Sequence, residues 1–221
     1  MKNTNYLYKY TDENGIVSIL EGEALKWGDP RYFNDEYELK IMPTVYTKNS
    51  KKLIKKSDVR KIFFSNIKEK KMKIISFTKN DNYSFMWNKY AQKHKGCMLE
   101  FSKEFEFSVG KDIQYIIGDR KVQLDKKFDI SNAKEIGFLL MDKIIYSKEY
   151  KWHKENEYRV VHPNLDSEDG KDYSLVKFKK ESLLSVTLGK NMEQSIALKV
   201  IKLLREKYPS TKIINLSQYT V

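Results

Sequence analysis

Two glutamates separated by one residue are the side chains in this sequence whose type and spacing best suit chemistry. Glu155 and Glu157 occur in the run Lys-Glu-Asn-Glu-Tyr-Arg, at the start of a predicted strand, Tyr158–Val161. In an extended segment, residues two apart point to the same side, so the two carboxyl groups would be held together. Such a pair can raise one carboxyl pKa, or let one carboxylate stabilise a cationic centre while the other positions a hydroxyl. The alternative is a surface strand edge at which the glutamates pair with Lys154 and Arg159.

Other kinds of active site find little support in the sequence. The candidate metal ligands His94, Cys97, His153 and His162 lack the paired spacing of zinc sites, so no metal is expected. The nine glycines form no Gly-x-Ser-x-Gly elbow, no P-loop and no Gly-x-Gly-x-x-Gly turn, which excludes those routes to serine hydrolysis and nucleotide binding. Cys97 is more typical of a buried strand cysteine than of a nucleophile.

Aromatic residues recur at helical spacing in the segment 82–95. Tyr83, Met86, Trp87 and Tyr90 form one stripe, which either packs in the core or lines part of a cavity. His94 lies near the end of the same predicted helix, where it would either pair with a phosphate or complement the helix dipole.

The chain is basic, and the excess charge is concentrated in one segment. It has 221 residues, with 42 Lys and Arg against 30 Asp and Glu, and a formal net charge of +12. Residues 48–73 hold eleven basic and two acidic side chains, which gives +9 of that total. The segment is either a solvated face or a surface that faces nucleic acid. The candidate nucleic-acid-binding residues are Lys51, Lys52, Lys55, Lys56, Arg60 and Lys61.

Composition favours one globular, cytoplasmic domain. With 40% hydrophobic residues the chain can bury a sizeable core, and a single core is the default at this length. The first ten residues lack the apolar run of a signal peptide, and the longest apolar runs are too short for a membrane span. A single cysteine allows no internal disulfide, which is typical of an intracellular protein.

The hydrophobic pattern predicts an α+β fold in one domain, residues 1–221, with the basic segment 48–73 as an insertion. Several strands come before the major helices, and the middle strands do not alternate regularly with helices. The expected strands are 5–10, 24–27, 73–78, 97–101, 113–117, 158–161, 175–178, 183–188 and 212–216. The first expected helix begins after the cap Thr11-Asp12 and ends at Gly22, and a second begins at the cap Ser57-Asp58. Three further helices are expected at 82–95, 131–147 and 192–208.

Several separated stretches occur together in a recognisable order. They are Leu7-Tyr8-Lys9-Tyr10, Phe33-Asn34-Asp35, Ser76-Phe77, Met86-Trp87-x-x-Tyr90-Ala91-x-x-His94-Lys95-Gly96 with Glu100-Phe101, Trp152-x-x-Glu155-x-Glu157-Tyr158-Arg159, and Leu188-Gly189. In this order they resemble a bacterial and phage family catalogued as domain of unknown function 2971, over roughly residues 7–192.

The opening of the chain also resembles the first motif of ADP-ribosyltransferases of the kind that includes the DarT toxins and the RNA phosphotransferases. In those enzymes a strand reading Leu-Tyr-His-x-Thr precedes a short helix, a small-residue stop and a second strand. Lys9 occupies the histidine position here, and a lysine can still donate to a ribose hydroxyl or a phosphate. The resemblance implies a mixed split β-sheet with flanking helices. It places Ser76 on the middle strand and Glu157 at the catalytic position, with Glu155 two residues before it.

The resemblance also implies a function, in which NAD is the substrate and no metal takes part. Cleavage of nicotinamide from NAD passes through an oxocarbenium-like centre, which a carboxylate such as Glu157 can stabilise. The expected acceptor is RNA or DNA bound by segment 48–73, in a toxin or phage-defence effector that an antitoxin or immunity protein would control. The alternatives are a non-catalytic nucleic-acid-binding module and an inactive protein-interaction module. The residues expected to contact NAD are Tyr8, Lys9, Tyr10, Phe33, Asn34, Trp87, Tyr90, His94 and Arg159.

Two of these residues have a second interpretation. Asn34, with the aspartate after it, would instead fix a loop by local turns. Arg159 is either a pyrophosphate ligand or a partner of Glu155 or Glu157.

Overall fold

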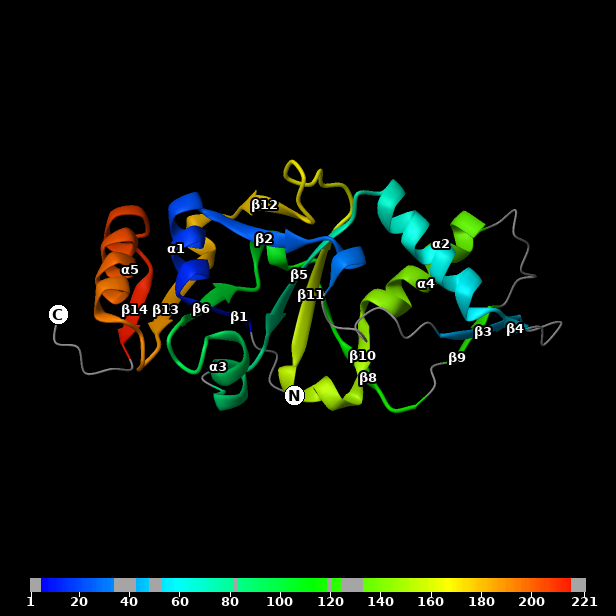
Figure 1. The fold of residues 1–221 in the computed structure, drawn as a ribbon, viewed down its shortest axis with the longest axis horizontal. Helices are drawn as coiled ribbons and strands as arrows, with labels where there is room; N and C mark the ends of the chain where they lie inside the picture. The colour runs from blue at the N-terminus through cyan, green and yellow to red at the C-terminus, as the bar shows by residue number, and fades with distance from the viewer. Residues whose placement is uncertain are drawn as a thin grey trace.

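The computed structural model describes residues 5–33, 43–47, 53–81, 83–118, 121–124 and 133–215 (Figure 1). The strands are β1 (Tyr6–Thr11), β2 (Ala24–Gly28), β3 (Thr44–Thr47), β4 (Leu53–Ile54), β5 (Lys73–Thr78), β6 (Cys97–Ser102), β7 (Lys111–Asp112), β8 (Gln114–Ile116), β9 (Lys121–Leu124), β10 (Ser147–Glu149), β11 (Glu157–His162), β12 (Tyr173–Lys177), β13 (Leu183–Leu188) and β14 (Lys212–Asn215). The α-helices are α1 (Glu13–Gly22), α2 (Lys56–Glu69), α3 (Ser84–Tyr90), α4 (Ala133–Ile145) and α5 (Gln194–Lys207). Short 3-10 helices include η1 (Pro30–Tyr32), η2 (Phe105–Phe107), η4 (Tyr150–Glu155) and η5 (Lys180–Ser182). None of the described helices combines the length and apolar character needed to cross a membrane.

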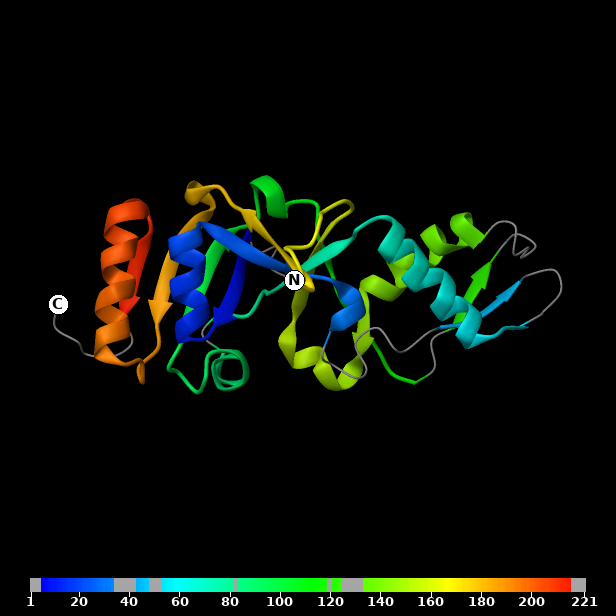
Figure 2. The same ribbon diagram turned by 45° about the horizontal axis from the view of Figure 1, so that its top comes forward.

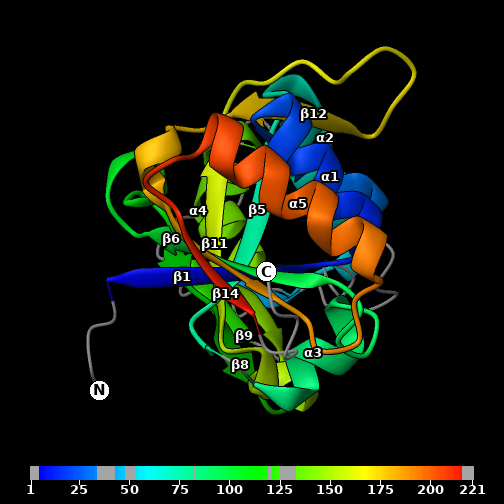
Figure 3. The same cartoon turned by 90° about the vertical axis from the view of Figure 1, so that its left-hand side faces the viewer.

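A nine-stranded sheet forms the centre of the molecule. Its main order is β12-β2-β5-β1-β6-β13-β14, with β11 paired to β5 and β7 paired to β11. β13 and β14 run parallel, whereas the other neighbours in this sheet are antiparallel. Helices α1 and α5 lie side by side on one face, and α3 lies at the lower edge (Figure 3). The predicted α+β fold, with a mixed sheet and flanking helices, is confirmed.

The sheet forks at β5. One edge of β5 pairs with β11 along its whole length. The opposite edge pairs with β2 only at Ile74 and with β1 only at Thr78, so β1 and β2 separate along β5. Between those two points, the Lys9 ammonium donates to the Ser76 carbonyl at 3.3 Å. The side chain of Lys9 thus takes the hydrogen-bonding place that a neighbouring strand would fill.

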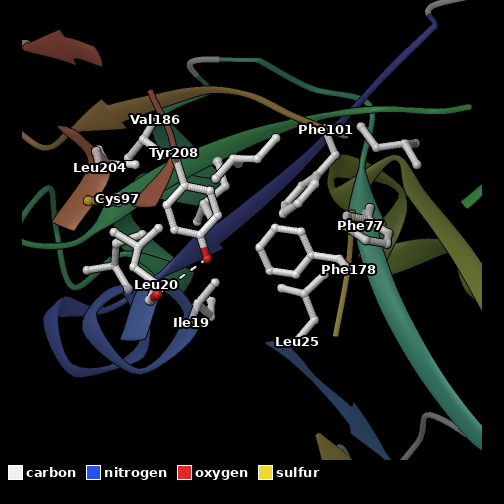
Figure 4. Packing of buried hydrophobic residues seen from close by; sticks show 14 of the residues in the cluster. Ile19, Leu20, Leu25, Phe77, Cys97, Phe101, Phe178, Val186, Leu204 and Tyr208 are labelled. Atoms are coloured by element: carbon white, nitrogen blue, oxygen red, sulfur yellow. Dashed lines mark hydrogen bonds between the residues drawn. The ribbon is translucent and has the colours of Figure 1, made fainter. Parts of the chain in front are cut away.

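The larger hydrophobic core lies between the sheet and the helices α1 and α5. Aromatic rings of Phe77, Phe101 and Phe178 meet edge to face within it, as seen in Figure 4. The Tyr208 hydroxyl at the end of α5 donates to the carbonyl of Leu20 in α1 at 3.3 Å, which ties the two helices together.

A second core lies between α2 and α4, on the right in Figures 1 and 2. Helix α2 contributes Val59, Phe63 and Ile67 to this core, and all three are buried. The helices meet closely at Gly137 of α4, where an added Cβ would lie 2.1 Å from the amide nitrogen of Asn66. Two small sheets, β4-β3-β9 and β10-β8, accompany these helices.

Helix α1 ends at Gly22, as predicted, and the left-handed residue that follows it is Glu23 (φ 52°), whose N–H caps the helix at the carbonyl of Ile19. Helix α4 stops at Ile145 rather than at residue 147, because the Ser147 hydroxyl bonds back to the end of the helix and the chain then enters β10.

Helix α3 is shorter than the predicted 82–95. It ends at Tyr90, and the next turn places three consecutive residues, Gln92, Lys93 and His94, at positive φ. This turn brings Gly96 so close to β1 that an added Cβ would lie 1.9 Å from the Thr11 carbonyl oxygen. A helix continued to residue 95 would not allow that approach.

Candidate functional site

Three strands far apart in the sequence place their side chains in one row across the sheet. Tyr8 of β1 is the register partner of Thr78 in β5, and Thr78 is in turn the partner of Glu157 in β11. Ser76, two residues before Thr78, stands opposite Arg159 in the same pairing of β5 with β11, and its side chain contributes to the lowered pKa of the Glu157 carboxyl group. The residues predicted to share a site on the first, middle and last of these strands are therefore neighbours.

Glu157 is buried and held from several sides. Its Oε1 accepts from Nε of Arg159 at 2.6 Å, and its Oε2 accepts from Nη2 of Arg159 at 3.2 Å and from Nζ of Lys148 at 3.3 Å. The remaining guanidinium nitrogen of Arg159 donates to the Ile145 carbonyl at 2.6 Å. Arg159 has no exposed surface and Glu157 only 5%. The alternative of a surface strand edge is therefore wrong, although the pairing of Glu157 with Arg159 is present.

The charges around Glu157 decide its protonation. Burial alone would raise the pKa of the Glu157 carboxyl, but the neighbouring Arg159 and Lys148 outweigh burial and lower that pKa from 4.5 to about 2. The carboxylate is therefore ionised at neutral pH.

Glu155 lies beside Glu157, but the backbone between them differs from the predicted extended strand. It ends η4, and Asn156 between the two glutamates is left-handed (φ 44°), so the segment is not extended. Oε1 of Glu155 accepts from Nζ of Lys89 at 2.7 Å and from the hydroxyl of Tyr90 at 2.5 Å. Asparagine is enriched among residues that adopt positive φ, so the residue type at position 156 is compatible with a turn between the two glutamates.

Two residues that the sequence analysis did not single out complete the site. Lys148 of β10 donates to Oε2 of Glu155 at 2.7 Å as well as to Glu157. Tyr115 of β8 is the register partner of Lys148, and its hydroxyl accepts the Glu157 backbone N–H at 2.8 Å. Neither residue has a sequence motif around it, because its role depends on the pairing of β8 with β10.

Lys9 lies close to this cluster, in the fork of the sheet. Its ammonium group stands 5.8 Å from the centre of the Phe77 ring, in addition to its bond to the Ser76 carbonyl. Burial lowers the pKa of Lys9 from 10.5 to about 8, and the Glu157 carboxylate partly opposes this shift.

The aromatic residues expected to contact NAD are mostly packed in a third, small core. Trp87 is fully buried and Tyr10 is 7% exposed, and their rings meet edge to face at 5.2 Å. The Tyr10 hydroxyl donates to the carbonyl of Asn80 at 3.3 Å. Tyr8 is 9% exposed, and burial together with Glu100 raises the pKa of its hydroxyl to about 12. Of the two alternatives for the aromatic stripe, packing in the core or lining a cavity, Trp87 takes the first.

The remaining candidates for NAD contact lie in different places. His94 stacks on Trp87 at 4.8 Å, and burial with the charge of Lys190 lowers its pKa, which weakens its proposed role as a cation at a helix end. Phe33 packs against the second core, beside Gly28. Asn34 lies outside the described residues.

The basic helix does not border the glutamate pair. Lys55, Lys56, Arg60 and Lys61 are exposed, whereas Lys51 and Lys52 lie outside the described residues. In Figures 1 and 3, α2 lies in the upper part of the molecule, and α3 lies at the lower edge. Glu155 and Glu157 belong to the lower side, because α3 supplies Lys89 and Tyr90 to Glu155. Lys73, which ends the basic segment, is buried and pairs with Asp29 at 3.1 Å.

Within the described ranges, no three His, Cys, Asp or Glu side chains are grouped in a way that could hold a metal ion. Comparison with models of protein families, with curated proteins and with solved structures finds no match to this chain.

Proposed function

We propose that the protein is an NAD-dependent ADP-ribosyltransferase, with an ADP-ribosyltransferase-like fold. The observation that carries the proposal is the row formed by Tyr8, Thr78 and Glu157, with Ser76 opposite Arg159 in the same pairing of β5 with β11. An ionised carboxylate at the meeting point of three strands suits a reaction whose transition state is cationic.

The reaction breaks the bond between the nicotinamide nitrogen and C1′ of the ribose, and the bonding electrons leave with nicotinamide. The positive charge that develops on the ribose is stabilised by Glu157, which accepts a ribose hydroxyl. That hydroxyl donates to the Glu157 carboxylate beside the contact from Lys148 at 3.3 Å. An acceptor nucleophile then bonds to C1′ and gives its proton to the solvent. Glu155, anchored by Lys89 and Tyr90, stands next to that step.

We place the acceptor on a surface made by α3 and η4 rather than on α2. This α3–η4 surface consists of Lys89, Tyr90, Tyr150, Trp152 and His153. Tyr150 is 48% exposed and stacks on His153 at 4.5 Å, and the Lys89 ammonium stands 3.6 Å from the centre of the Trp152 ring. Exposed rings beside cations are the groups that bind nucleic-acid bases and phosphates. The acceptor is therefore RNA or DNA, in a toxin or phage-defence effector, and an antitoxin or immunity protein is the corresponding partner.

The test is incubation of the protein with NAD labelled in its adenylate part, together with RNA, DNA or cell protein. Label transfer to nucleic acid and release of nicotinamide are expected, and Glu157→Gln abolishes both. Glu157→Asp keeps the negative charge beside Arg159, but its shorter side chain moves the carboxylate away from the ribose. This variant is therefore expected to lose most of the activity. Glu181→Gln, at an exposed position, is the matched control. An absence of both transfer and nicotinamide release from the folded wild type contradicts the proposal.

One observation favours a second function, a nucleic-acid-binding module without catalysis. Both carboxylates are already paired with cations, which is also typical of an internal ion-pair network that only supports a surface. This module would show salt-dependent nucleic-acid binding that Glu157→Asp leaves unchanged. Tyr90→Ala with Tyr150→Ala tests the α3–η4 surface, and Lys55, Lys56, Arg60 and Lys61 changed together to Glu test α2.

A further inference from the structure

We infer that Lys148 is a positioning residue that keeps Glu157 ionised and correctly placed beside a second carboxylate. The inference deepens the proposed function and rests on it for its catalytic meaning. Lys148 was not among the residues that the sequence suggested.

The first support is geometric. One ammonium group lies 2.7 Å from Oε2 of Glu155 and 3.3 Å from Oε2 of Glu157, so it bridges the two carboxylates. The side chains of Lys148, Glu155 and Glu157 are each about 5% exposed, so water does little to separate the charges. Two buried carboxylates side by side repel each other, and such a pair normally takes up a proton on one member.

The second support is the balance of charge along the cluster. Arg159 neutralises Glu157 from one side, and Lys89 neutralises Glu155 from the other. Lys148 stands between them and is the contact that the two carboxylates share. Its loss leaves the mutual repulsion of Glu155 and Glu157 without the cation that lies between them.

The third support is the way the backbone holds Lys148. Strand β10 pairs in parallel with β8, and the pairing places Lys148 next to Tyr115. Both residues contact Glu157, Lys148 at the carboxylate and Tyr115 at the backbone N–H. The two-stranded sheet therefore fixes Glu157 at both its side chain and its main chain. A flexible surface lysine would be unable to do this.

The experiment is a pH titration of the glutamate carboxyl carbons by NMR on isotope-labelled protein, without NAD. In Lys148→Met, the carboxyl group of Glu157 is expected to titrate at least about one pH unit higher than in the wild type. Lys148→Arg retains the wild-type titration. Lys154→Met, which removes an exposed positive charge next to Glu155 in the sequence, is the matched control and causes no shift. A folded Lys148→Met protein with an unshifted titration overturns the inference.

A second comparison covers the case in which Lys148→Met does not fold. Glu155→Gln and the double variant Lys148→Met/Glu155→Gln differ only in Lys148, and the double variant leaves no carboxylate without a cation. Glu157 is expected to titrate about one unit higher in the double variant than in Glu155→Gln. Identical titrations in the two proteins overturn the inference.

The readouts separate this inference from the proposed function. A shifted titration in a protein that never cleaves NAD supports the role of Lys148 and removes the proposed activity. Cleavage of NAD by Lys148→Met at the wild-type rate and with the wild-type pH profile, together with an unshifted titration, supports the activity and removes the role of Lys148.

Discussion

Arg159 carries a full positive charge without any exposed surface. Its burial is tolerated because the guanidinium makes a two-point contact with Glu157 and a third bond to the carbonyl of Ile145. Removal of one partner from a buried ion pair typically costs about 3–5 kcal/mol, because the other charge remains buried and uncompensated. We expect Arg159→Met to lower the free energy of unfolding by about that amount in urea denaturation.

A surface ion pair serves as the control for this prediction. Lys71 pairs with Asp166 at 2.5 Å, but both side chains are largely exposed. Lys71→Met is expected to change the free energy of unfolding by less than about 1 kcal/mol. If Arg159→Met is as mild as this control, the buried pair is not the stabilising contact described here.

The pKa of Glu157 gives a second prediction at the same scale. Its folded value, about 2, lies below its ordinary value of 4.5, so the unfolded chain binds more protons between those two values. The stability that Glu157 contributes is therefore complete above about pH 4.5 and is lost as the pH falls toward 2. Chemical denaturation across this range is expected to show a steeper loss of stability in the wild type than in Glu157→Gln. Equal slopes in the two proteins would count against an ionised Glu157.

Among the elements, the short strands β8 and β10 supply two contacts to Glu157, one from Tyr115 and one from Lys148. Tyr115→Phe removes the hydroxyl that accepts the Glu157 N–H at 2.8 Å and leaves the ring in place. Loss of one partner from a partly buried hydrogen bond costs about 1–3 kcal/mol. We expect faster hydrogen exchange at the amide of Glu157, with the rest of β11 little changed. Exchange at that amide as slow as in the wild type would show that Tyr115 does not hold it.

The sequence predicted elements well where burial follows a simple pattern. The strand Lys73–Thr78 was predicted with its observed bounds, because nearly every residue in it is buried and apolar or small. β10 was missed because its three residues, Ser147–Glu149, carry no apolar pattern and follow directly on a strongly apolar helix. β3, β4 and β9 were also missed, and each is short.

The candidate site was predicted as a set of strands but not as a set of contacts. Ser76 and Glu157 were placed on the correct strands, and the structure brings these strands together. The roles of Lys148 and Tyr115 depend on which strands pair across large sequence separations, which local patterns do not encode. Their contribution could be found only in three dimensions.

Over the whole molecule, the two larger cores are joined by β5 and β11. Ile74 at the start of β5 belongs to the core of α2 and α4, whereas Phe77 at its end belongs to the core of α1 and α5. Phe63→Ala, in α2, leaves a cavity and is expected to cost about 3–5 kcal/mol. Hydrogen exchange should rise in α2 and α4 more than in α1 and α5. A uniform rise through both parts would show that they unfold as one unit.

The net charge of +12 takes on a different meaning at this scale. Most of it lies in residues 48–73, and the part of that segment in α2 lies in the upper part of the molecule, whereas α3, which contacts Glu155, lies at the lower edge. The surface next to Glu155 carries the exposed rings of Tyr90 and Tyr150. Counting charges along the sequence located the basic segment, but only the packing of α2 against α4 shows which side of the molecule it occupies.

The fork at β5 has a consequence for how the protein is made. The bond from Lys9 to Ser76 closes over 67 positions, and the bond from Thr78 to Glu155 closes over 77 more. A ribosome that adds about 5–20 residues per second needs on the order of ten seconds to pass from the first of these residues to the last. In the later part of that time β1 and β5 have been synthesised but β11 has not, so Ser76 is present without Glu157. The growing chain therefore contains no assembled site, and the activity proposed here can begin only when most of the protein has left the ribosome.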